Sequence, residues 1–106
     1  MLMAAPPPPQ NAAAQGRESY ARCLKDFVRA SAEKKMDGPA FDAALAAACR
    51  DKETLFKNAM ISSEVAMGVK RAVSEKGVLE EISTYRSMAK EDFQAELQFL
   101  ASAKPN

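Results

Sequence analysis

The sequence predicts an all-α protein, in which an antiparallel helical hairpin is joined by a disulfide and packs with one or two further helices as a small three-helix bundle. Apolar residues recur at helical spacing in both halves of the chain. A short turn separates the first two helical stretches, and each of these carries one of the two cysteines. With 106 residues, 7% of them aromatic, the chain can form one small domain with a thin core.

The first arm of the hairpin begins near Ser19. Its apolar residues follow one another at the spacing of one helix face, and they are Tyr20, Cys23, Leu24, Phe27 and Val28. This pattern ends at residues 33–35, where two lysines suit a helix C-terminus. Residues 36–39 then form a turn, with Asp37 as the N-cap of the next helix and Pro39 in its first turn.

The second arm covers residues 39–60. One stripe of this arm is apolar apart from a single lysine, and it consists of Phe41, Leu45, Ala48, Cys49, Lys52 and Phe56. The alanine-rich run at residues 43–48 has a high helix propensity and small side chains that let a neighbouring helix come close. Because the turn is short, we expect this arm to lie antiparallel to the first.

The two cysteines occupy matching heights on the two arms. Cys23 and Cys49 are equally distant in sequence from Met36, near the centre of the turn, and each lies on an apolar stripe. We therefore predict a disulfide between them, which would add about 3 kcal/mol of stability in the chain-entropy model. Two inert buried thiols are the alternative. A redox-active pair is less favoured, because such sites use closely spaced Cys-x-x-Cys motifs.

The second half of the chain is helical in character, but its helix boundaries stay open. Residues 62–63 could cap a new helix and Gly77 could end one, and Gly68 is a third interruption. A glycine inside a helix costs only about 1 kcal/mol, so one long bent helix is the alternative. From Val78 onward the apolar residues define one face of a helix of about 20 residues.

This C-terminal apolar face either completes the core or binds a partner. Its candidate partner-binding residues are Tyr85, Phe93, Leu97 and Leu100. We favour the core, because so short a chain has little apolar surface to spare.

Residues 1–16 differ from the rest of the chain in composition. They carry no charged side chain and include four consecutive prolines, which are incompatible with a regular helix or sheet. We expect this Pro/Ala-rich segment to be disordered and residues 17–103 to form a single helical domain. The alanine triplet at residues 12–14 has the small side chains of a signal-peptidase site, so the segment could be the remnant of a secretory signal. A plain linker is the alternative.

The composition argues against several classes of function. The chain has no histidine, so it lacks the commonest general base and the commonest metal ligand. We predict no catalytic residue, no metal site and no cofactor, and therefore not an enzyme. A net charge of +1 without a strongly basic segment argues against nucleic-acid binding. We expect no transmembrane segment, because no apolar run approaches the ~20 residues that span a bilayer.

The remaining interpretation is a small exported helical protein, periplasmic or secreted, that acts through contacts with a protein partner or with copies of itself. A cytoplasmic helical adaptor with reduced cysteines is the alternative, and a thiol redox protein is a weaker one. No motif in the chain points to a more specific function.

Overall fold

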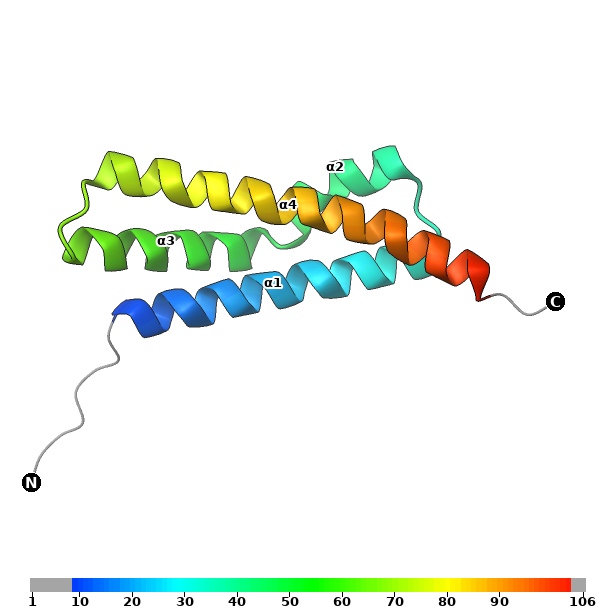
Figure 1. Cartoon of the computed structure of the whole chain (residues 1–106), viewed down its shortest axis with the longest axis horizontal. Helices are drawn as coiled ribbons and strands as arrows, with labels where there is room; N and C mark the ends of the chain where they lie inside the picture. The colour runs from blue at the N-terminus through cyan, green and yellow to red at the C-terminus, as the bar shows by residue number, and fades with distance from the viewer. Residues whose placement is uncertain (1–8, 104–106) are drawn as a thin grey trace, which may run out of the picture.

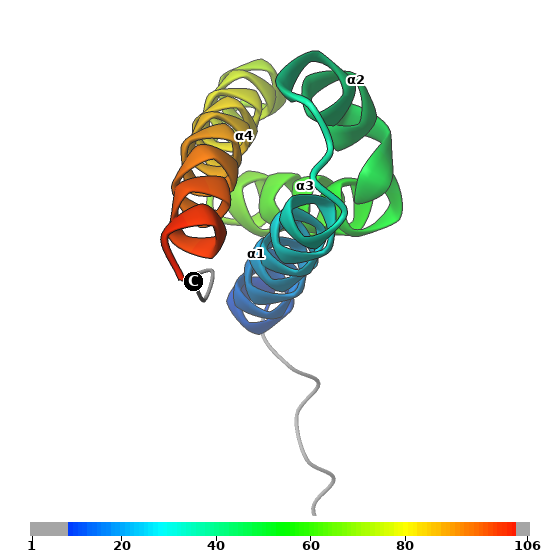
Figure 2. The ribbon, with the colours of Figure 1, turned by 90° about the vertical axis from the view of Figure 1, so that its right-hand side faces the viewer.

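The computed structural model describes residues 9–103, which form four helices and no strand (Figure 1). These are α1 (Pro9–Glu33), α2 (Gly38–Ala48), α3 (Arg50–Ala66) and α4 (Arg71–Ser102). Helices α1 and α4 run in one direction, and α2 and α3 together run back in the other. The end-on view of Figure 2 places α4 on the left, α1 at the lower right and α2 at the upper right. The predicted all-α helical bundle is confirmed, with its middle arm divided into two helices.

Helix α1 begins earlier than the sequence predicted. We expected residues 1–16 to lie outside the fold, but α1 starts at Pro9, and Ala13 is already buried. A proline is well tolerated in the first turn of a helix, because the N–H that it lacks would have no partner there. The alanines that follow have the highest helix propensity of all residues. The predicted boundary at residue 17 therefore gives way to one at residue 9, and residues 1–8 lie outside the described part of the chain.

The predicted turn between the first two helices is confirmed. Lys35 takes the left-handed conformation, with φ at 57°, and the Met36 N–H donates to the Ser31 carbonyl at 3.0 Å, which closes the end of α1. The Asp37 side chain accepts a hydrogen bond of 2.8 Å from the Ala40 N–H and so caps α2, as its position predicted.

The second arm of the hairpin is broken at Cys49. This residue leaves the helical conformation, with φ at −123° and ψ at 31°, and separates α2 from α3. The break moves two residues off the predicted apolar stripe, because Ala48 and Lys52 are exposed. The sequence contains no proline or glycine near the break. It falls at the cysteine that lies against Cys23 of α1.

Only one of the three expected interruptions in the second half ends a helix. Gly68 has φ at +99°, a backbone conformation that residues other than glycine rarely adopt. The Val69 N–H donates to the Glu64 carbonyl at 2.9 Å and closes the end of α3. Helix α3 passes through residues 62–63 without a break. Helix α4 passes through Gly77 and reaches 32 residues, longer than the predicted helix of about 20.

The core runs along the inside of this bundle. Its largest fully buried side chains come from all four helices, and they include Tyr20, Phe41, Phe56 and Phe93. Helices α1 and α3 approach closely at Gly16, where a Cβ atom would lie 3.0 Å from the Phe56 Cα. Within residues 9–103, no helix is both long and apolar enough to cross a membrane.

Candidate functional site

The two cysteines lie at disulfide distance, as their spacing predicted. The sulfur atoms of Cys23 and Cys49 are 2.11 Å apart, and their Cα atoms are 6.0 Å apart. This Cα separation is typical of two residues that a disulfide joins. Cys49 is only 4% exposed, whereas Cys23 is half-buried and lines a shallow surface hollow. This arrangement suits a covalent link between helices better than a site of thiol exchange.

A first polar cluster joins α1 to α4. The Arg17 Nε donates to a Glu81 carboxylate oxygen at 2.7 Å, and the Tyr85 hydroxyl donates to the same oxygen at 2.7 Å. The arginine also lies over the Phe56 ring, 5.3 Å from its centroid. The hydrogen bond from Arg17 lowers the pKa of the Glu81 carboxyl. Glu81 therefore stays ionised and matched to its arginine.

A second polar cluster joins α3 to α1 and α4. The Arg86 guanidinium donates to a Glu53 carboxylate oxygen at 2.5 Å, and the Tyr20 hydroxyl donates to the same oxygen at 3.1 Å. Burial, followed by the nearby Glu53 charge, raises the pKa of Tyr20 to about 12. Within residues 11–103, the Arg86 Nε is the one buried side-chain nitrogen or oxygen atom that finds no hydrogen-bond partner.

These two clusters hold helices together. The Glu53 carboxylate accepts hydrogen bonds from Tyr20 of α1 and Arg86 of α4, and the Glu81 carboxylate accepts them from Arg17 of α1 and from Tyr85, one turn further along α4 itself. In the described part of the chain, no three histidine, cysteine or acidic side chains gather closely enough to hold a metal ion.

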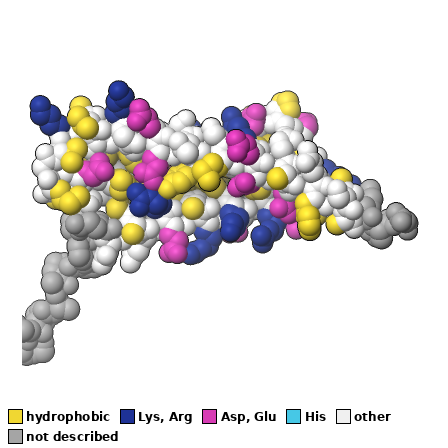
Figure 3. Space-filling view, viewed as in Figure 1, with side chains coloured by type: hydrophobic (Ala, Val, Ile, Leu, Met, Phe, Trp, Pro, Cys, Tyr) yellow, Lys and Arg dark blue, Asp and Glu magenta, His cyan; other side chains and the backbone are white. Residues whose placement is uncertain are grey.

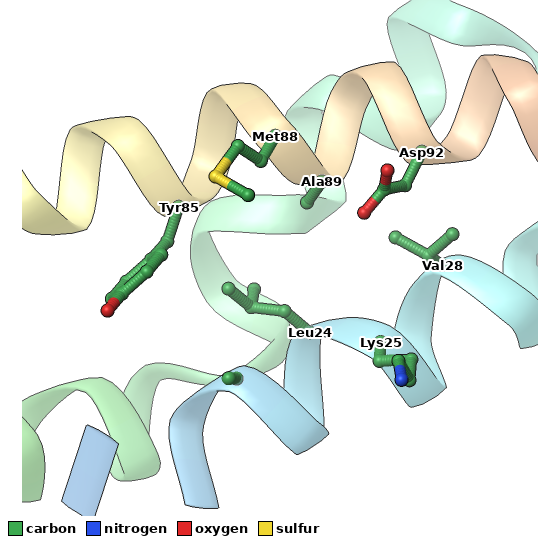
Figure 4. Close-up of a pocket in the computed structure, with 8 residues that line it drawn as sticks. Leu24, Lys25, Val28, Tyr85, Met88, Ala89 and Asp92 are labelled. Atoms are coloured by element: carbon green, nitrogen blue, oxygen red, sulfur yellow. The ribbon is translucent and has the colours of Figure 1, made fainter. Parts of the chain in front are cut away.

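A groove lies between α1 and α4, formed by two adjoining hollows of about 210 and 380 Å³. We call it the α1–α4 groove. Lys25, Val28 and Asp92 line both hollows, so the two form one continuous channel. Figure 4 shows Leu24 and Val28 of α1 facing Met88 and Ala89 of α4 across the first hollow. The remaining lining residues are Ala21, Arg29, Tyr85, Ala95, Glu96 and Phe99.

The two edges of the groove carry opposite charges. Helix α1 contributes Lys25 and Arg29, the basic rim, and α4 contributes Asp92 and Glu96, the acidic rim. None of these four side chains makes an ion pair or a side-chain hydrogen bond with another residue in the range 11–103. In the space-filling view of Figure 3, hydrophobic side chains gather along the middle of the molecule, and several basic side chains stand along its lower edge with acidic ones among them.

Large apolar side chains stand exposed on the α4 side of the groove. Met88 is 51% exposed and Phe99 is 65% exposed, although both line the groove. The apolar residues on the α1 side are Ala21, Leu24 and Val28, and the last two are buried. The large exposed apolar side chains of the groove therefore stand on its α4 wall.

The structure separates the four residues of the predicted partner-binding face. Phe93 is 1% exposed and its ring stacks on Phe41 at 4.0 Å, so it belongs to the core and is not available to a partner. Tyr85 is half-buried in a wall of the α1–α4 groove. Leu97 and Leu100 line a separate hollow beside Ala32, where Leu100 remains 37% exposed.

Met88 and Phe99 were missed because they lie off the stripe that the helical spacing singled out. A second stripe at the same spacing runs through Met88, Asp92, Ala95 and Phe99. Its acidic member made it less conspicuous than the all-apolar stripe. Helical spacing alone could have found it.

Comparisons with protein-family models, with curated proteins and with solved structures find no match to this chain.

Proposed function

We propose that this protein is a binding module that acts through the α1–α4 groove, in an oxidising compartment outside the cytoplasm. The observation that carries the proposal is the groove itself, in which exposed apolar side chains lie between two unpaired rims of opposite charge. Protein interfaces combine these features, because a central apolar patch supplies affinity and charged edges supply orientation.

The residue types in the groove support a protein contact. Phenylalanine, methionine and arginine are enriched at interfaces relative to the rest of a protein surface. Met88 has a flexible side chain that can adapt to the shape of a partner, and Phe99 offers a large apolar area. The carboxylates of the two polar clusters are engaged between helices, which favours binding over catalysis.

Export is supported by the disulfide. Such bonds persist in secreted and periplasmic proteins and are rare in the cytoplasm, where thiols are kept reduced. The alanine triplet at residues 12–14 no longer adds to this argument, because it lies within α1 and Ala13 is buried. Cleavage after Ala14 would remove a part of α1 that packs against the bundle.

Site-specific photocrosslinking tests the binding function. A photoreactive phenylalanine derivative replaces Met88 in the groove or Thr54, which is exposed on α3 and lines none of the hollows described above. After illumination of cells that produce each variant, we expect a discrete protein adduct from position 88 and none from position 54. An absence of adducts from position 88, or equal adducts from both positions, would contradict the proposed function.

Intact mass spectrometry tests the compartment. The protein is isolated from its native host and alkylated, once without a reductant and once after reduction. We expect Cys23 and Cys49 to become alkylated only after reduction. Two thiols that react without reduction would favour the cytoplasmic adaptor, and rapid reaction of the reduced, folded protein at neutral pH would favour a redox role.

A further inference from the structure

We propose that the α1–α4 groove binds a second copy of this chain, forming a symmetric dimer whose twofold axis runs parallel to the groove. This inference rests on the proposed function and names the partner. It is carried by the order of the charges and by the distribution of exposed apolar side chains across the groove.

The opposite charges face each other at matching heights. Lys25 and Asp92 line the same two hollows, and Arg29 and Glu96 line the second of them, so the basic and acidic rims run side by side. Helices α1 and α4 also point in the same direction (Figure 1). Height along the groove therefore increases with residue number on both rims.

A half-turn about an axis parallel to the groove exchanges the two rims while it keeps their heights. It places α1 of one copy over α4 of the other, so that Lys25 faces Asp92 of the second copy and Arg29 faces Glu96. A half-turn about the perpendicular axis in the same plane would instead place α1 over α1 and α4 over α4. That arrangement brings like charges together, so the charge order selects the first one.

The exposed apolar side chains agree with the same axis. Met88 lines the first hollow together with Ala21, and Phe99 lines the second together with Val28. The half-turn along the groove brings the exposed Met88 and Phe99 of α4 over the α1 wall of the other copy, whose apolar residues Leu24 and Val28 do not protrude. The exposed area of Met88 and Phe99 is then covered on both copies at once.

The extent of the groove indicates a dimer of modest affinity. From Tyr85 to Phe99 the wall formed by α4 is about 20 Å long at the rise of an α-helix. Two helices of that length make a contact at the small end of specific interfaces. We therefore expect a dimer that dissociates on dilution and weakens in high salt, which screens the rim charges.

Charge reversal tests the arrangement by sedimentation velocity at low ionic strength, with the protein varied from about 10 µM to about 1 mM. The variant K25E/R29E has two acidic rims, and D92K/E96K has two basic rims. We expect the dissociation constant of the dimer to be more than tenfold higher for each variant alone than for the unaltered protein. An equimolar mixture should form a one-to-one heterodimer, and the fourfold variant that combines all changes should dimerise again.

A matched pair of variants controls for net charge. K34E/K76E and E80K/E91K carry the same charge changes at exposed positions that line neither hollow of the groove. We expect each of them to dimerise like the unaltered protein.

Three results would overturn the dimer: an unaltered protein that stays monomeric up to 1 mM, reversed-charge variants that dimerise normally, or control variants that lose dimerisation as well. If the unaltered protein is monomeric while position 88 still crosslinks to a different protein, the binding function stands and only the second copy is excluded. If position 88 yields no adduct and no dimer forms, both proposals fail.

Discussion

Ring packing joins the helices in both halves of the bundle, but only one half adds ion pairs between helices to it. In the half that contains the turn between α3 and α4, the rings of Tyr20, Phe56 and Tyr85 pack together. Two polar clusters join the helices there, in which Glu53 and Glu81 each accept hydrogen bonds from an arginine and a tyrosine. Near the turn between α1 and α2, they are joined by stacked rings, with Phe41 between Phe27 at 5.3 Å and Phe93 at 4.0 Å. We call these regions the polar half and the aromatic half.

The two kinds of contact do different things: ring packing contributes most of the stability, whereas the ion pairs align the helices. Ring packing in the aromatic half removes apolar area from water, which is a large and weakly directional contribution. The ion pairs of the polar half contribute less free energy, because desolvation offsets much of their attraction, but each one requires a particular rotation of α4 against α1 and α3. The Cys23–Cys49 link ties α1 to the junction of α2 and α3. Correct alignment of α4 against α1 is also what forms the α1–α4 groove.

Removal of one buried ring from the aromatic half should have the largest effect on stability. Phe93→Ala removes a ring that is 1% exposed and stacked on Phe41, and we expect a loss of about 3–5 kcal/mol in the free energy of unfolding. Chemical denaturation followed by circular dichroism measures it. Phe99→Ala is the matched control, because that ring is 65% exposed and its loss should cost less than about 1 kcal/mol. Equal losses would show that Phe93 is not in the core.

Loss of the Cys23–Cys49 disulfide should have the second largest effect on stability. We expect Cys23→Ser combined with Cys49→Ser to lower the free energy of unfolding by about 3 kcal/mol, because the unfolded chain regains the entropy of an open loop. Denaturation of the unaltered protein with and without a reductant provides an independent measure. The double variant should no longer respond to the reductant. Unchanged stability in both experiments would mean that the two arms need no covalent link.

Alkaline pH should weaken the polar half through Tyr20. Its pKa in the folded protein is about 12, above the value of about 10 expected in the unfolded chain, so the unfolded chain releases this proton first. The contribution is fully present below pH 10 and is lost as the pH rises to about 12, by about 2–3 kcal/mol. Tyr20→Phe should flatten this part of the stability profile. An equally steep loss in that variant would place the effect elsewhere.

Removal of one arginine from the polar half should have the smallest effect of the four. Arg86→Met leaves the Glu53 carboxylate, whose side chain is 19% exposed, without its ionic partner, and we expect a loss of about 2 kcal/mol. Arg22→Met is the control, because its pair with Glu18 is exposed on both sides and should contribute less than about 1 kcal/mol. Similar losses in the two variants would contradict an aligning role for the polar half.

Local sequence patterns predicted the features that depend on neighbours along the chain. Helical spacing predicted the buried stripe of α1, and the sequence around Asp37 predicted the cap of α2. The equal distances of Cys23 and Cys49 from the turn predicted that the two sulfurs would meet. Each inference needed only the period of a helix and the position of one turn.

Features that depend on how the helices rotate against one another were not predictable in this way. Arg17 and Glu81 lie 64 residues apart in sequence, and nothing in their local surroundings indicates that they pair. The break at Cys49 has no proline or glycine beside it, so the second arm was expected to be continuous. The α1–α4 groove likewise appears only once α4 is placed beside α1.

Zero-length crosslinking of an isotopically mixed sample tests most directly whether two copies meet through the α1–α4 groove. Unlabelled and ¹⁵N-labelled protein are mixed, allowed to exchange and treated with a carbodiimide, which joins a lysine amine to a nearby carboxylate. We predict an amide between Lys25 and Asp92 in which one peptide is labelled and the other is not. Links between copies that form only elsewhere, or a Lys25–Asp92 link found only within single chains, would contradict the proposed dimer.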